Sequence, residues 1–500
     1  MNKYYNNVLL IMADQHRSNY MNGEGPVPTP NIDRIAKRGL TFKNAFCAYP
    51  VCLASRCSML TGLYAHKSGA VNNTDFLDRR IRTAAHHFSA AGYYTGLIGK
   101  MHFNDSCNHG YEFYTSINDW LMYLGPKASH YADEIASHQL AEHFFHSVYD
   151  DGAGFPDLAG VWEKGKNPWI GNVTRYEPGQ PVSKLDSCDH MDAFFARETC
   201  KFLEKHGGQP FFLTVSFMKP HTPFFPPAEY SKRYPHENMV LQDAGDLSQH
   251  SSYVRGVSER YSNITETNRK SAKAGYYANL AFADDCIGEV LDAVERLGLA
   301  EKTIIVYTSD HGEMDGDHGL YQKFCMFDPS VKVPFIISHP GKIAENAVTD
   351  RLVSQVGLYP TLAELTGTAP VNVKTLAPMQ NAPSCIDGAS FAKKINDYSL
   401  KDDADETVFA EFAISSERSA QYMIRGGRYK FVHYGTGECE LFDLEADPGE
   451  KINLAAKGGY GNKMDEMKQK IEKIINRELN ANEKIQPSDT NTPKLIFPQP

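Results

Sequence analysis

Four short apolar runs, each followed at once by charged or histidine side chains, constrain the fold of this chain more than any other feature. The runs span residues 8–13, 94–98, 211–217 and 303–308. Continuous runs of this kind are typical of strands that are buried on both faces of a parallel sheet. Amphipathic helical patterns separate them, and the longest covers residues 272–297. This alternation predicts an α/β fold with a large, mostly parallel sheet between layers of helices.

The pattern changes in the last part of the chain. Residues 422–444 predict a β-hairpin with a Gly-Gly turn and one further strand. Residues 464–479 place apolar side chains on one face of a helix. We therefore expect a large α/β domain at 1–385. At 386–500 we expect a small subdomain with an antiparallel sheet, a helix and a tail.

Composition excludes several classes of partner. The 500-residue chain has a formal net charge of −10 and no basic block, which argues against nucleic acid. No apolar run approaches the ~18 residues of a membrane-spanning helix. The first apolar run, at 8–12, is too short for a signal peptide, so a cytoplasmic protein is expected. The ten cysteines are scattered, which favours reduced thiols. Homo-oligomerisation stays open.

Polar side chains gather where the four predicted strands end. They are Asp14 and Gln15 after the first strand, Lys100 and His102 after the second, His221 after the third, and Asp310, His311, Glu313 and Lys323 after the fourth. In open parallel sheets the carboxyl ends of the strands share one edge, and ligands bind there. One such cluster would be ordinary loop polarity, but four together predict a shared site. Its oxygen-rich donors suit Ca²⁺, with Mg²⁺ or Mn²⁺ as alternatives, better than zinc.

Residues 50–62 predict a loop that runs into a short helix beginning near Cys52. A helix N-terminus stabilises negative charge on a sulfur. An isolated cysteine is usually a small core residue, so a functional interpretation of Cys52 depends on the clusters at the strand ends. Beside them, Cys52 is the candidate nucleophile. Arg56, Lys100 and Lys323 supply the positive charge that a tetrahedral anion requires.

Together these residues resemble the type I, formylglycine-dependent sulfatases of the alkaline phosphatase superfamily, and within them the carbohydrate and choline sulfatases. Cys52–Arg56 matches the family pattern Cys-x-Pro/Ala-x-Arg. Met12–Gln15, Gly99–His102, Lys219–Pro223 and Ser309–Gly312 are also similar to family segments, and the likeness extends over almost the whole chain. The resemblance implies an alkaline-phosphatase-like fold and a sulfuric ester hydrolase.

The resemblance also implies a cofactor set. It assigns a Ca²⁺ ion to Asp14, Gln15, Asp310, His311 and the modified Cys52. Cys52 would be oxidised to formylglycine by a maturase. One hydroxyl of the hydrated aldehyde would attack sulfur, and the other would later lose its proton to release sulfate.

The remaining polar residues receive roles by the same resemblance. Arg56 and Lys100 would hold the formylglycine oxygens, and His102 would accept the proton that regenerates the aldehyde. His221 and Lys323 would bind the sulfate group. His221 would also protonate the leaving alcohol.

The sequence leaves alternatives open for the substrate and for the class of protein. The region 104–190 is rich in aromatic and histidine residues, which favours a sulfated sugar or a glycosaminoglycan fragment. Choline sulfate is the competitor, since Asp119, Trp120 and Tyr123 are candidates for a cage around a quaternary ammonium. A phosphonate monoester or phosphodiester hydrolase is a further alternative within the superfamily. A non-catalytic protein that binds sulfated ligands is the alternative from a different class.

Overall fold

The computed structural model describes residues 7–105, 107–129, 182–262, 264–371, 374–379, 383, 385–403, 405–413 and 420–476. Most of the region 104–190 and the end of the C-terminal tail lie outside these residues. Among the described helices, none is both long and apolar enough to span a membrane.

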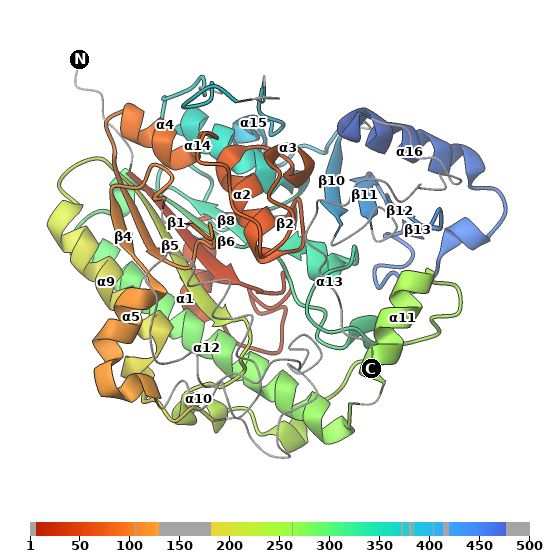
Figure 1. Ribbon diagram of the computed structural model, residues 1–500, viewed down its shortest axis with the longest axis horizontal. Helices are drawn as coiled ribbons and strands as arrows, with labels where there is room; N and C mark the ends of the chain where they lie inside the picture. Colours follow the sequence, from red (N-terminus) through yellow and green to blue (C-terminus); the bar gives the residue numbers. More distant parts are fainter. Residues whose placement is uncertain are drawn as a thin grey trace.

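A nine-stranded sheet forms the centre of the molecule (Figure 1). Its strands lie in the order β4 (Phe113–Thr115), β3 (Tyr94–Gly99), β5 (Phe211–Pro220), β1 (Asn7–Asp14), β6 (Thr303–Ser309), β8 (Phe335–Ser338), β2 (Gly39–Phe46) and β7 (Lys332–Val333), with β9 (Ala347–Ser354) beside β2. The five strands from β4 to β6 are parallel, whereas β8 is antiparallel to both of its neighbours. The predicted, mostly parallel α/β sheet is confirmed.

Helices cover both faces of this sheet, because successive side chains of a buried strand point to opposite sides. Leu9 and Ile11 of β1 pack in one core with α1 (Pro30–Lys37), α9 (Met191–His206) and α12 (Glu266–Arg296). The alternate residues of β1 pack in a second core, with three helices on the opposite face (Figure 1). These are α2 (Cys52–Thr61), α4 (Ala84–Ala90) and α14 (Leu358–Leu365).

Further helices lie in the connections. They are α3 (Ala65–Ser68), α5 (Ile117–Leu124), α10 (Ala228–Ser231), α11 (Ser252–Tyr261), α13 (Asp328–Val331) and α15 (Ala392–Asn396). α2 begins at Cys52, as predicted. It is followed by Gly62, whose φ of 71° is the left-handed conformation that the residue after a helix favours.

A second, four-stranded sheet follows in the chain and is antiparallel throughout, as predicted. It consists of β10 (Thr407–Phe412), β11 (Gln421–Gly426), β12 (Tyr429–Tyr434) and β13 (Cys439–Asp443). α16 (Gly461–Ile475) covers one face and buries Met467 and Ile471 there (Figure 1). The other face belongs to the same apolar core as α2 and α14. The domain division at residue 385 stays a prediction.

A buried ion cluster joins this second sheet to the chain around α13. Lys430 Nζ on β12 lies 2.8 Å from Asp328 Oδ1 and 2.6 Å from Glu450 Oε1. Glu450 in turn accepts a hydrogen bond from the backbone N–H of Asp328 at 2.6 Å. Burial raises the pKa of Glu450 to about 7, against the opposing effect of Lys430. Since Lys430 and Glu450 are almost wholly buried, water does not replace a lost partner.

Replacing Lys430 by Met should therefore lower the free energy of unfolding by about 3–5 kcal/mol, because a buried carboxylate loses its cation. Chemical unfolding followed by circular dichroism measures this change. The matched control is Lys463→Met, which removes an exposed pair with Glu466 and should cost less than about 1 kcal/mol. Equal losses for the two variants would contradict the importance of the cluster.

Candidate active site

The ends of four adjacent strands bring the predicted side chains together. Asp14 ends β1, Lys100 follows β3, His221 follows β5, and Asp310 follows β6. The strand order β3-β5-β1-β6 makes these ends neighbours along one edge of the sheet. Cys52, the first residue of α2, faces the same edge, and its Sγ lies 3.9 Å from Asp14 Oδ1.

Arg56 holds this edge together. Its fully buried guanidinium donates to Asp14 Oδ2 and Asp310 Oδ2, both at 2.9 Å. It also donates to the Lys100 carbonyl at 2.6 Å and to Ser216 Oγ at 2.7 Å. Because it lies one turn along α2 from Cys52, Arg56 fixes the helix N-terminus over the strand ends.

These bonds occupy Oδ2 of Asp14 and of Asp310, which we call the outer oxygens. The inner oxygens, Oδ1 of each carboxylate, face a common point. His311 Nε2 lies 3.8 Å from Asp14 Oδ1, 3.7 Å from Asp310 Oδ1 and 3.2 Å from Cys52 Sγ. Ligand atoms of these four buried residues all lie within 4.8 Å of one another. Two carboxylate oxygens and an imidazole nitrogen fit a divalent cation, and an oxygen in place of the Cys52 sulfur would make the set harder.

The surroundings of Cys52 favour negative charge. Burial alone raises the pKa of a thiol, but Lys100, Lys323 and His311 outweigh it and lower the pKa of Cys52 well below its usual value. Asp14 responds in the same way: burial opposes its ionisation, yet Lys100 at 2.5 Å helps to bring its pKa below the usual range. The site is therefore built to hold anionic groups.

His102 and His221 lie beside Cys52 as neutral rings. Burial lowers the pKa of His102 against the opposing effect of the neighbouring Cys52, and within the described residues neither ring nitrogen makes a well-aligned hydrogen bond. Burial, with Lys323, lowers the pKa of His221 to about 4. The Nζ of Lys323 lies 3.0 Å from His221 Nε2 and 3.8 Å from Cys52 Sγ. The free nitrogens of His102 are thus available to a bound group.

Gln15 lies at the same edge, although its amide is engaged with two neighbours. Its Nε2 donates to Glu313 Oε2 at 2.5 Å, and its Oε1 accepts from Lys323 Nζ at 2.9 Å. The metal-ligand role predicted for Gln15 stays a prediction. Sequence reasoning missed Ser216, whose only signal was a hydroxyl within a mostly apolar strand.

The three residues suggested as a cation cage do not form one. Trp120 is buried and donates from Nε1 to the Asp189 carbonyl at 2.8 Å. Asp119 accepts from the Ser116 backbone at 2.6 Å and so caps α5. Tyr123 donates to Asp189 Oδ1 at 3.0 Å. The interpretation of these residues as a choline cage is wrong, because the Trp120 ring is buried and Asp119 caps its own helix. Trp120 and Tyr123 fasten α5 to Asp189, just before α9.

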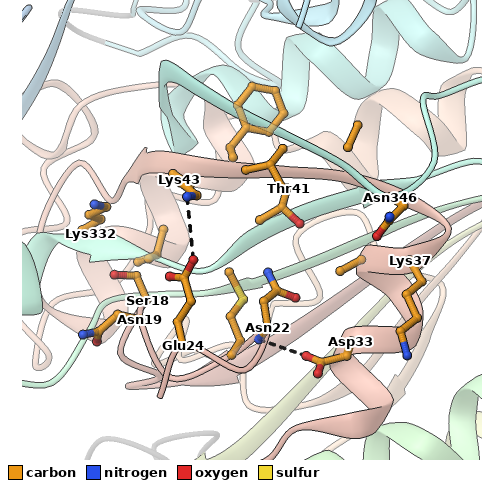
Figure 2. A pocket seen from close by; sticks show the side chains of 16 residues that line it. Ser18, Asn19, Asn22, Glu24, Asp33, Lys37, Thr41, Lys43, Lys332 and Asn346 are labelled. Atoms are coloured by element: carbon orange, nitrogen blue, oxygen red, sulfur yellow. Dashed lines mark hydrogen bonds and ion pairs between the residues drawn. The ribbon is translucent and has the colours of Figure 1, made fainter. Parts of the chain in front are cut away.

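Two other features fall outside this site. Asp105, Cys107 and His109 form a second group with metal-ligand spacing, but Asp105 is already bonded to Arg79 at 2.8 Å and to His109 at 3.0 Å. A cavity of about 400 Å³ lies among the loop after β1, α1, β2 and the start of β9. Figure 2 shows the side chains that line it. None of the ten predicted site residues lines that cavity.

We expect Asp310→Asn to lose bound divalent metal, since it removes the charge of one of the two carboxylates whose inner oxygens converge. The matched control is Asp105→Asn, in the second group, which should keep the metal content of the unaltered protein. Plasma mass spectrometry of the purified proteins measures both. Loss of metal from the Asp105→Asn control alone would place the ion at the second group and contradict the assignment to the strand ends.

The cations and carboxylates at this sheet edge suit a tetrahedral anion held beside a divalent cation. Residues 6–368 match the family model described as sulfatase, and residues 316–477 match the model of the C-terminal region of N-sulphoglucosamine sulphohydrolase. The chain therefore belongs to the sulfatase family and is a sulfuric ester hydrolase, as the sequence predicted.

Two curated relatives have similar sequences over most of their length. The choline-sulfatase of Rhizobium meliloti is 29% identical over 471 residues, which are 90% of this chain and 82% of the relative. The arylsulfatase of Clostridium perfringens is 29% identical over 495 residues, which are 95% of each chain.

Two solved structures share the fold. One is the phosphonate monoester hydrolase of Agrobacterium radiobacter, with a TM-score of 0.71, 23% identity, and coverage of 94% of this chain and 95% of that one. The other is a protein in complex with its substrate D-glucosamine-2-N,6-O-disulfate. Its TM-score is 0.70, with 20% identity and coverage of 94% of this chain and 98% of that one.

Proposed function

We propose that this enzyme cleaves the sulfate monoester of a small sulfated sugar or glycosaminoglycan fragment, with Cys52 converted to formylglycine by a maturase. The observation that carries the proposal is the position of Cys52. It begins α2 at the sheet edge where two carboxylates, two lysines and three histidines converge.

The cofactors fit the donors that are present. Asp14, Asp310 and His311 would hold a divalent cation, with the modified Cys52 as a further ligand, and the oxygen-rich set favours Ca²⁺ over Mg²⁺ or Mn²⁺. The amide oxygen of Gln15 is directed instead to Lys323. When bound, the cation polarises the sulfuryl oxygens, and hydrated formylglycine supplies the oxygen nucleophile.

The surrounding cations orient the sulfate ester. Lys323 and His221 lie on one side of Cys52, and Lys100 contacts Asp14 next to it. Ammonium groups fixed in a buried site stabilise the charge that develops on the sulfuryl oxygens. Arg56 contributes by position, because its donors are already directed to carboxylates and backbone. His102, with both ring nitrogens free, accepts a proton at the Cys52 position.

Protonation of the leaving alcohol falls to Lys323 and His221 together. The neutral His221 ring donates from Nδ1 to the Thr222 carbonyl at 2.7 Å, which leaves Nε2 as the acceptor from Lys323. The pair thus shares one proton across a 3.0 Å hydrogen bond. When that proton passes to the leaving oxygen, the alcohol departs neutral rather than as an alkoxide.

An exposed aromatic side chain, in a loop that contacts the start of α2, supports a sugar substrate. Asn73 Oδ1 accepts from the Leu53 backbone at the start of α2, and the Asn73 carbonyl accepts from Asn104, two residues after His102. Phe76 follows in this loop and is 63% exposed. Since such a ring can stack on the apolar face of a sugar, Phe76 is our candidate for the residue that recognises it.

Choline sulfate is the second candidate, because the relative from Rhizobium meliloti is named a choline-sulfatase. The engagement of Asp119, Trp120 and Tyr123 in the packing of α5 argues against it. Phosphonate monoesters are a further candidate, favoured by the fold shared with the enzyme from Agrobacterium radiobacter.

Peptide mass spectrometry tests the nucleophile. In active enzyme, the Cys52 side chain should have lost H₂S and gained one oxygen atom. The peptide containing it should therefore be lighter than the encoded peptide by the difference between these two masses. Protein produced without a maturase should retain the cysteine and lack activity. Full turnover by enzyme with an unmodified Cys52 would contradict the proposal.

A substrate panel tests the sugar assignment. We expect turnover of 2-, 4- or 6-sulfated mono- and disaccharides, and the Phe76→Ala variant should raise KM for the preferred sugar about 10-fold through the lost stacking contact. Its KM for a small aryl sulfate should hardly change. Met122→Ala, which shortens another exposed apolar side chain on α5, is the control. Turnover of choline sulfate alone would contradict the sugar proposal.

A further inference from the structure

Glu313 is a buried carboxylate to which the proposed mechanism gives no role. It lies in the loop after β6 and is 3% exposed. It accepts hydrogen bonds from three N–H groups and, within the part of the chain that the structure describes, forms no ion pair. A carboxylate removed from water in this way is costly to bury. A function at the site would explain its presence there.

The two oxygens of Glu313 have separate partners. Oε1 accepts from the backbone N–H groups of Asp315 at 2.8 Å and Gln322 at 2.6 Å, which fixes the carboxylate within its loop. Oε2 accepts from Gln15 Nε2 at 2.5 Å. This contact holds the NH₂ end of the Gln15 amide toward Glu313, because only that end can donate. The carbonyl end must then point the other way.

That carbonyl end faces Lys323. Gln15 Oε1 lies 2.9 Å from Lys323 Nζ, which also lies 3.0 Å from His221 Nε2 and 3.8 Å from Cys52 Sγ. An ammonium has three N–H donors. With two of them directed at Gln15 and His221, the third is directed toward Cys52.

We infer that Glu313 is a positioning residue, which acts through the Gln15 amide to direct the Lys323 ammonium at the sulfuryl group held beside Cys52. This inference rests on the proposed function of the site. A merely structural Glu313 would close its own loop through Asp315 and Gln322, and its replacement would not depend on Gln15.

The Glu313→Gln variant separates the two roles. Its oxygen can still accept from the two backbone N–H groups, so its NH₂ end then faces the NH₂ end of Gln15. To avoid that clash Gln15 turns over, which brings its Nε2 against the Lys323 ammonium. We expect the affinity for inorganic sulfate, measured by calorimetry, and kcat for 4-nitrophenyl sulfate each to fall about 10- to 100-fold. The thermal midpoint should change little.

A double-mutant cycle shows whether Glu313 acts through Gln15. In a Gln15→Ala background, Glu313→Gln should cause no further loss of sulfate affinity or of kcat, because the connecting amide is absent. The control Glu229→Gln, exposed on α10, should match the unaltered enzyme. Additive losses, or a lowered thermal midpoint with unchanged sulfate binding, would overturn the inference.

The outcomes also distinguish this inference from the proposed function. A protein that binds sulfate in a Glu313-dependent manner but hydrolyses no sulfate ester would contradict the proposed function while supporting the positioning role. An enzyme that hydrolyses sulfate esters equally well with and without Glu313 would support the proposed function and contradict the positioning role.

Discussion

The double ion pair of Arg56 with Asp14 and Asp310 is the interaction on which the rest of this site depends. All three side chains are fully buried, so their charges must compensate one another at short distance. Without Arg56, both buried carboxylates would lose the guanidinium that they share, and Asp14 would keep Lys100 as its nearest cation. With it, each carboxylate turns one oxygen toward a common point, and that point is where a cation fits.

The same guanidinium explains how two layers of the fold make one site. Its contacts reach residues at the ends of β1, β3 and β6 and one residue within β5, while its backbone belongs to α2. α2 is buried along its whole length and shares an apolar core with the large sheet and with β10–β12. The nucleophile position is therefore held by a helix that has little freedom to move. Such rigidity suits chemistry that depends on fixed donors and acceptors.

The central sheet could be predicted because its strands are buried on both faces and so consist of continuous apolar residues. The polar residues at their ends were predictable for the same reason, since each follows a clear boundary. β2 and β9 were not predicted. They carry Lys43 and Asn44, and Asp350 and Arg351, which face partly into solvent and interrupt the apolar pattern.

Side-chain partners within the site were harder to predict than its location. Gln15 and Glu313 are 298 residues apart in the chain, and no local pattern indicates that one amide would connect a carboxylate to Lys323. The cage assigned to Trp120 failed for a similar reason. Trp120 is bonded in the folded chain to the carbonyl of Asp189, which lies 69 residues further along the sequence. Composition identifies residue types, whereas the contacts that give them a role arise from the tertiary fold.

The most direct test of this account is a crystal structure of the Cys52→Ala protein with Ca²⁺ and a sulfated glucosamine. We predict that the sulfate group lies at the position of the missing sulfur, within hydrogen-bond reach of Lys323 Nζ. We also predict that the ion contacts the inner oxygens of Asp14 and Asp310. A sulfate group bound in the cavity of Figure 2, with the strand-end site empty, would contradict it.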